Sequence, residues 1–181
     1  MSISLDGFIA GPNDKPGNPG GDGFIRLHEW GIEPAGAGAQ LMDDINTTGA
    51  VLTGRRTAEQ AGHWRGLHHG VDIPIFVLSH RPPDPSVAEY PLVTYLNDDL
   101  ETAMATAMAA AGEHDLLVHG GNLATQALEA GILDEVQIHQ VPVLFGGGRR
   151  LFEVLPKHVE LEIVRVVDTP EATHIRYRVR R

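Results

Sequence analysis

The stretch Ala50-Val51-Leu52-Thr53-Gly54-Arg55-Arg56-Thr57 decides the fold of this chain. Its first half predicts a buried strand, Gly54 predicts a tight turn, and the residues that follow predict the start of a helix. Such a turn directs free backbone N–H groups toward an anion, and paired guanidinium groups suit a phosphate. A second stretch has the same organisation, with two glycines in the turn: Leu116-Leu117-Val118-His119-Gly120-Gly121-Asn122-Leu123. Together the two turns predict a nucleotide cofactor with several phosphates.

The composition is that of an ordinary globular protein. The chain has 181 residues, 42% of them hydrophobic and 21% charged, and no apolar run that approaches the ~20 residues of a membrane span. It has no cysteine, which excludes disulfides, thiolate catalysis and cysteine-type zinc sites. No signal peptide is visible, so we expect a cytoplasmic location.

The net charge of −10 argues against nonspecific binding to nucleic acid or to anionic membranes, since both need clustered Lys and Arg. Arginines do gather at the C-terminus, at positions 176, 178, 180 and 181. The first three alternate with apolar residues, which predicts a strand with one solvated face rather than a binding patch.

Strands and helices alternate along the chain and predict an α/β fold, with a mostly parallel central sheet and an antiparallel C-terminal hairpin. Residues 1–181 are expected to form one domain, whose first strand begins abruptly and is therefore expected to be truncated at the N-terminus. Loops are expected at residues 11–23 and 62–73 and a short helical turn at 24–30. The helix at about 99–111 should be capped by Asn97 or Asp98. The other helices are expected near 40–45, 57–61 and 122–130, and strands near 1–5, 8–10, 50–53, 75–78, 92–96, 115–119, 136–141, 161–167 and 173–179.

Ligands of open α/β sheets bind beyond the carboxyl ends of the strands. The residues that follow the predicted strands therefore include the candidate site: Arg55 and Arg56 supply charge, Thr57 and Ser79 supply hydroxyls, and the glycines at 120 and 121 allow close approach. No Gly-x-Gly-x-x-Gly opens the first strand-to-helix turn and no P-loop motif is present, so neither a Rossmann fingerprint nor a P-loop fits. Residues 146–148, all glycine, could form a third anion contact or a mobile turn.

Several other residues have two readings. Asp6 could orient a substrate or relay a proton, whereas the commoner role of Asp before Gly is to form a turn. Trp30 could stack on a planar ring or close the core. His119 could donate to a phosphate or be buried and satisfied. The histidines at 63, 68 and 69 match no zinc signature and predict a solvated loop, so no metal is expected.

Six short motifs occur in a fixed order: Ser4-Leu5-Asp6-Gly7-Phe8-Ile9-Ala10-Gly11, Gly54-Arg55-Arg56-Thr57-Ala58-Glu59, Val77-Leu78-Ser79, Gly120-Gly121-Asn122-Leu123, Ala130-Gly131-Ile132-Leu133-Asp134-Glu135-Val136 and Pro142-Val143-Leu144-Phe145-Gly146-Gly147-Gly148. Together they resemble the dihydrofolate-reductase-like superfamily. Within it, the chain is similar to the C-terminal reductase domain of the bifunctional riboflavin-biosynthesis deaminase–reductase and to its stand-alone relatives. The resemblance covers nearly the whole chain and implies a single-domain, three-layer fold, NADPH as the hydride donor and a homodimer.

The resemblance also implies roles for individual residues. Arg55, Arg56 and Thr57, next to Gly54, would hold the 2′-phosphate and pyrophosphate region. Ser79, assisted by Arg81, would hold the adenosine ribose and its phosphate. Gly120, Gly121, Asn122 and Leu123 would line the pyrophosphate and the nicotinamide. Asp6 and the segment that contains Trp30 would flank the substrate. Paired arginines independently suit the phosphate monoester that NADH lacks.

The implied activity is an NADPH-dependent reduction of the riboflavin-biosynthesis type, in which the ribosyl group of a pyrimidine becomes ribityl, or of another small heterocyclic or carbonyl substrate. Residues 34–40 lack the carboxylate that dihydrofolate reductases carry before their Gly-Arg-x-Thr turn, which argues against folate reduction. Two alternatives stay open. One is a noncatalytic nucleotide-binding protein, and the other is a weak dihydrofolate reductase that uses Asp6 or a water in place of the missing acid.

Overall fold

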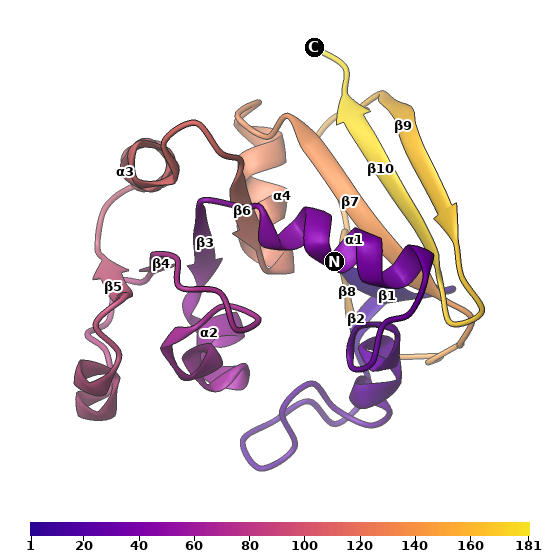
Figure 1. The fold of residues 1–181 in the computed structure, drawn as a ribbon, viewed down its shortest axis with the longest axis horizontal. Coiled ribbons are helices and arrows are strands. Elements are labelled where there is room, and N and C mark those ends of the chain that lie inside the picture. Colours follow the sequence, from indigo (N-terminus) through magenta and orange to yellow (C-terminus); the bar gives the residue numbers. More distant parts are fainter. The chain divides into compact units, whose positions relative to one another are not determined.

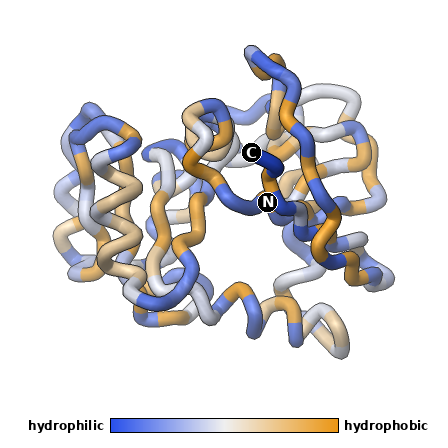
Figure 2. The backbone as a smooth tube through the Cα atoms, turned by 90° about the horizontal axis from the view of Figure 1, so that it is seen from above, coloured by the Kyte–Doolittle hydropathy of each residue, from blue (hydrophilic) through white to orange (hydrophobic).

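The computed structural model describes residues 1–181, and its contacts group into two compact units. Asp43–Ala124 form one, here called the parallel-sheet unit. Met1–Met42 and Thr125–Arg181 form the other, here called the mixed-sheet unit. No helix is long and apolar enough to cross a membrane, and Figure 2 shows that apolar stretches of the backbone are short and separated by polar ones.

The parallel-sheet unit is built on four parallel strands in the order β5-β4-β3-β6 (Figure 1). The central strand β3 (Ala50–Gly54) has β4 (Ile75–Leu78) on one side and β6 (Leu116–His119) on the other, and β5 (Val93–Leu96) forms the edge. The apolar run Ala50–Thr53 therefore lies inside this sheet and not at its edge.

Both faces of β3 are covered, which explains why its sequence is apolar without alternation. Val51 packs in one buried cluster with Ala58 of α2 (Arg55–Gln60). Leu52 packs in another with Ala103 and Ala107 of α3 (Leu100–Ala111). Val51 and Leu52 are both 0% exposed.

The cap of α3 differs from the prediction. The Thr102 backbone N–H donates to the Asp99 carboxylate at 2.8 Å, so Asp99 is the N-cap and not Asn97 or Asp98. All three are good capping residues, and only the position at which the chain turns into the helix selects among them. Gly112, with φ +65°, ends the helix.

The mixed-sheet unit has four strands in the order β1-β7-β10-β9. The first strand β1 (Ser2–Ser4) pairs parallel with β7 (Glu135–Val141), and the antiparallel hairpin of β9 (Leu161–Asp168) and β10 (Thr173–Val179) completes the sheet. A separate ribbon joins β2 (Phe8–Ala10) to β8 (Arg149–Arg150). The α/β fold with a parallel sheet and an antiparallel C-terminal hairpin is confirmed, whereas the single domain stays a prediction.

The remaining elements are short helices. Two 3₁₀ turns, η1 (Phe24–Leu27) and η2 (Glu29–Gly31), occupy the segment for which a helical turn is predicted. The α-helices α1 (Ala37–Asn46) and α4 (Gly121–Glu129) connect the two units along the chain. Along the chain, the 3₁₀ turn η3 (Gly62–Gly66) comes between β3 and β4, and the 3₁₀ turn η4 (Pro85–Glu89) comes between β4 and β5. Strand β8 is not expected from sequence, because two consecutive arginines carry no strand pattern.

Candidate functional site

The carboxyl ends of the parallel strands lie along one edge of their sheet. Gly54 is in register with Leu78, and Leu78 with Leu96, while Thr53 is in register with His119. The chain therefore leaves all four strands at nearly the same level. The strand order reverses at β3, because β4 follows on one side and β6 lies on the other. Ligands of open α/β sheets bind at such a switch point.

The two predicted phosphate turns are in direct contact at this switch point. Gly120 has φ +109°, and a Cβ atom there would lie 2.7 Å from Thr57 Oγ1. Only a glycine allows both this backbone conformation and this approach. Gly120 and Gly121 are buried, whereas Asn122 is exposed. The sequence predicts both turns, and the structure brings them together.

The start of α4 offers backbone donors beside this contact. Its first helical hydrogen bond runs from the Ala124 N–H to the Gly120 carbonyl at 2.9 Å. The N–H groups of Gly121, Asn122 and Leu123 therefore precede any partner within the helix. Donors in this arrangement, with the positive end of the helix dipole behind them, favour an anion. Residues 120–123 fit a pyrophosphate on this ground.

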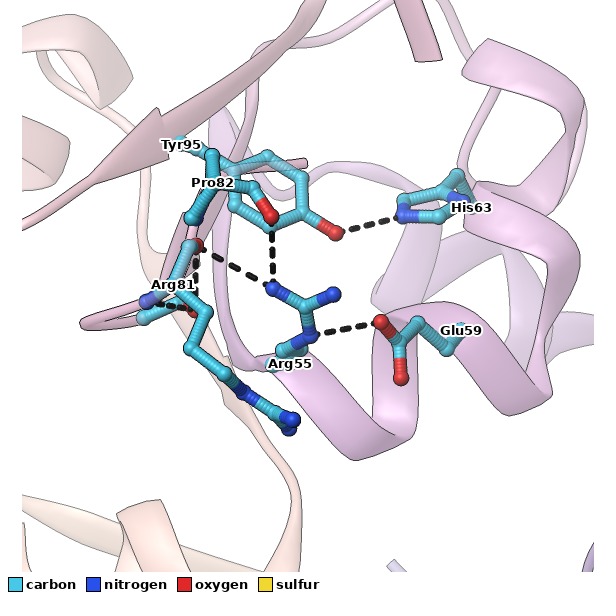
Figure 3. Close-up of polar contacts among 7 residues, drawn as sticks. Arg55, Glu59, His63, Arg81, Pro82 and Tyr95 are labelled. Carbon is cyan, nitrogen blue, oxygen red and sulfur yellow. Dashed lines mark hydrogen bonds and ion pairs between the residues drawn. The ribbon is translucent and has the colours of Figure 1, made fainter. Parts of the chain in front are cut away.

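The Arg55 side chain does not point into open space. Its Nη1 donates to the carbonyl oxygens of Arg81 at 3.1 Å and Pro82 at 2.7 Å (Figure 3). Its Nε forms an ion pair with Glu59 at 2.6 Å, and the side chain is only 21% exposed. The Glu59 partner is one helical turn away, and this i,i+4 spacing is a signal that the sequence carries. Arg55 thus joins the turn after β3 to the turn after β4.

Ser79 and Arg81 form the turn after β4. The Ser79 hydroxyl donates to the Arg81 carbonyl at 2.8 Å and accepts from the Arg81 N–H at 3.0 Å. Because its only proton is committed, the hydroxyl can accept a further bond from a ribose hydroxyl but cannot donate to a phosphate. The Arg81 side chain is exposed and extends away from Arg55 in Figure 3.

Further bonds extend the network to β5. His63 Nε2 lies 2.9 Å from the Tyr95 hydroxyl, and His80 Nδ1 lies 3.1 Å from Asn97 Oδ1. Burial lowers the pKa of His63 and raises the pKa of Tyr95, so both groups are neutral near pH 7. The turns after β3, β4 and β5 are consequently tied together by side chains.

The prediction of a solvated loop is wrong for His63 and His68, which are 8% and 2% exposed. The chain here forms a left-handed turn, with φ near +50° at His63, Trp64 and Arg65. Each such residue costs roughly 1–2 kcal/mol relative to a right-handed turn, which is why residue propensities do not reveal it. The Trp64 ring stacks on His119, just before Gly120, at a centroid distance of 5.5 Å.

Asp6 lies in the mixed-sheet unit and holds the loop after β7. Its carboxylate accepts from the Ser4 hydroxyl at 2.5 Å and from the N–H groups of Phe145 and Gly146 at 3.1 and 2.7 Å. These bonds, chiefly the one from Ser4, lower the pKa of Asp6 to about 2. An ionised acceptor of three hydrogen bonds favours the structural reading over a proton relay.

The same geometry decides between the two readings of Gly146–Gly148. The Gly146 N–H already bonds the Asp6 carboxylate, and Arg149 and Arg150 bond Asp14 and the Asp6 carbonyl at 3.2 and 2.9 Å. Because protein groups occupy these donors, a loop fixed by Asp6 fits better than either a mobile turn or a third anion contact.

Asp6→Asn is therefore expected to loosen the loop after β7. The Phe145 and Gly146 N–H groups donate to different carboxylate oxygens, and the amide nitrogen that replaces one of these oxygens cannot accept, so one of the two bonds is lost. Amide hydrogen exchange of residues 143–148 should become faster, with little change in the parallel-sheet unit. Asp22→Asn is the control, since that carboxylate lies in the 11–23 loop and contacts Asn13 and Asn18 instead. Unchanged exchange in Asp6→Asn would contradict the structural role.

Trp30 lies in the core of the mixed-sheet unit. It is 9% exposed, its indole N–H donates to the Ser2 hydroxyl at 2.9 Å, and its ring lies 4.2 and 4.8 Å from those of His139 and His174. This placement favours closure of the core over contact with a substrate.

The two histidines beside Trp30 share one proton. Their Nδ1 atoms are 2.9 Å apart, so one donates and the other accepts. Thr169 Oγ1 donates its proton to the Ala172 carbonyl, so it can only accept from His174 Nε2, which lies 3.3 Å away. A neutral His174 then carries its proton on Nε2, and His139 donates from Nδ1. Burial lowers the pKa of His174.

The chain belongs to the family described as the RibD C-terminal domain, whose model matches residues 1–175. This family is a family of reductase domains with the dihydrofolate-reductase-like fold. Among curated proteins, an uncharacterised protein of Bacillus subtilis (strain 168), YwjB, is 25% identical over 98% of this chain and 94% of its own length.

Solved structures show the same fold. A proposed riboflavin biosynthesis protein from Shewanella sp. PV-4 matches over the full length of both chains, with a TM-score of 0.78 and 22% identity. RibD of Acinetobacter baumannii matches with a TM-score of 0.64 and 18% identity, and this chain spans 57% of its length. A deaminase and 5-amino-6-(5-phosphoribosylamino)uracil reductase of Thermotoga maritima matches with a TM-score of 0.61 and 16% identity.

Proposed function

We propose that the protein is an NADPH-dependent reductase that acts on 5-amino-6-(5-phosphoribosylamino)uracil or on a related small heterocyclic or carbonyl compound. The observation that carries the proposal is the contact of two anion-suited turns, at Thr57 and Gly120, at the switch point of a parallel sheet. The family supports a reductase, and the name of the Thermotoga maritima relative supplies the substrate.

The residues of the parallel-sheet unit fit such a cofactor. The N–H groups of residues 121–123 suit the pyrophosphate, and the absent side chain of Gly120 lets the backbone approach it. Arg56 and Arg81, both exposed, suit the 2′-phosphate, and Ser79 suits a ribose hydroxyl. NADPH would supply the hydride when bound. All of these groups lie within one unit of the chain.

The proton that accompanies the hydride has a separate source in this proposal. Asp6 is ionised near pH 7 and bonded to three donors, which makes it a poor acid. We therefore assign the proton to solvent and give Asp6 no catalytic part. The test is turnover of Asp6→Asn, which should keep the wild-type pH profile even if its KM rises.

Binding and turnover together test the main proposal. Wild-type protein should bind NADPH more tightly than NADH in calorimetric titrations and should oxidise NADPH only when the pyrimidine substrate is added. The control is Lys157→Ala, which removes one exposed positive charge from the mixed-sheet unit. Equal affinities for NADPH and NADH would overturn the cofactor assignment.

A noncatalytic nucleotide-binding protein is the second candidate, and the bonded state of Asp6 favours it because the structure then offers no evident acid. Saturable NADPH binding without oxidation of the cofactor by any pyrimidine or pterin would select this candidate. Folate reduction has less support, since the only acids on α1 are Asp43 and Asp44, in its second half.

We also propose a homodimer that pairs through β9. This strand is the edge of its sheet, and its side chains Leu161, Ile163 and Val166 are 39%, 62% and 53% exposed. An open strand edge with apolar side chains favours pairing with an identical edge. Ile163→Asp should shift the mass measured by light scattering from dimer to monomer, whereas Glu153→Gln should not. A monomeric wild type would contradict the proposal.

A further inference from the structure

The family resemblance implies that Arg55 holds the cofactor phosphate, but the structure gives its guanidinium three protein partners. Two are backbone carbonyls, of Arg81 and Pro82, and the third is the Glu59 carboxylate. Figure 3 shows the guanidinium between helix α2 and the Arg81–Pro82 segment. The ring of Tyr95 lies beside it, 6.0 Å from the guanidinium carbon.

These contacts oppose a phosphate ligand at Arg55. Nη1 already donates to two carbonyls, and Nε is buried against the Glu59 carboxylate in an ion pair without hydrogen-bond geometry. A phosphate at Arg55 would have to displace this carboxylate or lie beside it, and two anions in contact repel each other. The planar fork of arginine is well suited to the contacts that it makes, because one group can bridge two carbonyls and a carboxylate at fixed angles. Its low exposure, 21%, agrees with a residue that holds structure together.

Arg81 has the opposite properties. Its side chain is exposed, it has no hydrogen-bond or ion-pair partner, and it extends away from Arg55 (Figure 3). Both polar groups of its backbone are nevertheless hydrogen-bonded. The Arg81 N–H donates to Ser79 Oγ at 3.0 Å, and the Arg81 carbonyl accepts from the Ser79 hydroxyl at 2.8 Å and from Arg55 Nη1 at 3.1 Å. Because the backbone is already ordered, only the Arg81 side chain has to lose freedom when it binds an anion.

We propose that Arg55 is a positioning residue that braces the Ser79–Pro82 turn and is not itself the ligand of the cofactor phosphate. The braced turn presents Arg81, to which the proposed function gives the 2′-phosphate of NADPH. The proposal rests on the proposed function for the role of Arg81, whereas the brace is a property of the protein without cofactor. It separates two roles: Arg81, together with Arg56, discriminates NADPH from NADH, whereas Arg55 serves both dinucleotides equally.

Calorimetric titration of wild type, Arg81→Ala and Arg55→Ala with NADPH and with NADH tests this division. Arg81→Ala should weaken NADPH binding about 10- to 100-fold, the range for a hydrogen bond between charged groups, and leave NADH binding unchanged. Arg55→Ala should weaken both by a similar factor and keep their ratio. Lys157→Ala controls for the loss of one positive charge and should match wild type.

Glu59→Gln gives predictions of opposite sign. If Arg55 were the phosphate ligand, removal of the competing carboxylate would strengthen NADPH binding. If Arg55 is a brace, Glu59→Gln loosens it and weakens NADPH and NADH alike. Arg55→Lys adds a conservative variant that is expected to fold, and a lysine should not restore the brace because a single ammonium cannot reproduce the fork.

Hydrogen exchange of the cofactor-free protein tests the brace directly. Residues 79–82 should exchange faster in Arg55→Ala and Arg55→Lys than in wild type, and should be unchanged in Arg81→Ala. A selective loss of NADPH affinity in Arg55→Ala, with exchange of residues 79–82 unchanged, would overturn the proposal. If wild-type protein binds no NADPH, the proposed function fails and the role of Arg81 fails with it, while the exchange data still decide whether Arg55 braces the turn.

Discussion

Replacement of Gly120 by alanine should destabilise the protein by about 2–5 kcal/mol and abolish NADPH binding. The positive φ of +109° costs an L-residue roughly 1–2 kcal/mol. The new Cβ would also lie 2.7 Å from Thr57 Oγ1, and overpacking of this kind adds about 1–3 kcal/mol. Since total stabilities are about 5–15 kcal/mol, a loss of this size is a large fraction of the whole. Urea denaturation measures the first effect and NADPH titration the second.

Gly131→Ala is a matched control for the backbone term alone. Gly131 also has a positive φ, of +71°, but a Cβ there meets nothing within 4 Å. Its loss of stability should therefore be smaller than that of Gly120→Ala, and its NADPH binding should be unchanged. The double variant Gly120→Ala/Thr57→Ala should recover part of the loss, because it removes the Thr57 hydroxyl that the new methyl group meets. Equal losses in Gly120→Ala and Gly131→Ala would show that the two turns are not in contact.

Acidification from pH 7 to pH 5 should destabilise the protein by at least about 2 kcal/mol. Burial of His68, which is 2% exposed, lowers its pKa to about 3, with a smaller contribution from the charge of His69. Between the unfolded pKa of 6.5 and this folded value, the unfolded chain binds more protons than the folded one. The free energy of unfolding therefore decreases as the pH is lowered through this range. One such group loses about 1.4 kcal/mol per pH unit, or roughly 2 kcal/mol from pH 6.5 to pH 5.

Other histidines act in the same direction. Burial also lowers the pKa values of His63 and His174, and His174 shares a proton with His139 in a geometry that leaves no place for a second one. Asp6 acts only at lower pH: its pKa is depressed to about 2, so its contribution is full above about pH 4 and is lost as the pH falls toward 2.

Denaturant unfolding at pH 7, 6 and 5 measures the dependence. His68→Gln should reduce the slope of stability against pH between pH 6.5 and pH 5, whatever its effect at pH 7, because the slope depends only on the protons bound. The matched substitution His114→Gln, at an exposed residue, should leave the slope unchanged. A stability that is constant from pH 7 to pH 5 would contradict the burial of His68.

The strands and turns of the parallel sheet were predictable because their signals are local. The apolar run of β3 shows that both of its faces are covered, and a glycine after a buried strand indicates a tight turn wherever the strand lies. Asp6 shows the limit of such signals. Its position before Gly7 allows both a catalytic and a structural reading, and only the bonds from Phe145 and Gly146, about 140 residues away along the chain, favour one of them.

The sequence by itself determined the α/β class, the parallel core, the C-terminal hairpin and the two glycine-containing turns, since each depends on residues that are neighbours along the chain. Only the tertiary structure decided what the side chains around those turns contact. Arg55 meets carbonyls 26 and 27 residues away, and His68 is buried by a left-handed turn that its residue types disfavour. The physical reason is that a guanidinium or an imidazole takes its role from its surroundings: the same charge suits a phosphate when it is free, and braces the backbone when carbonyls and a carboxylate reach it first.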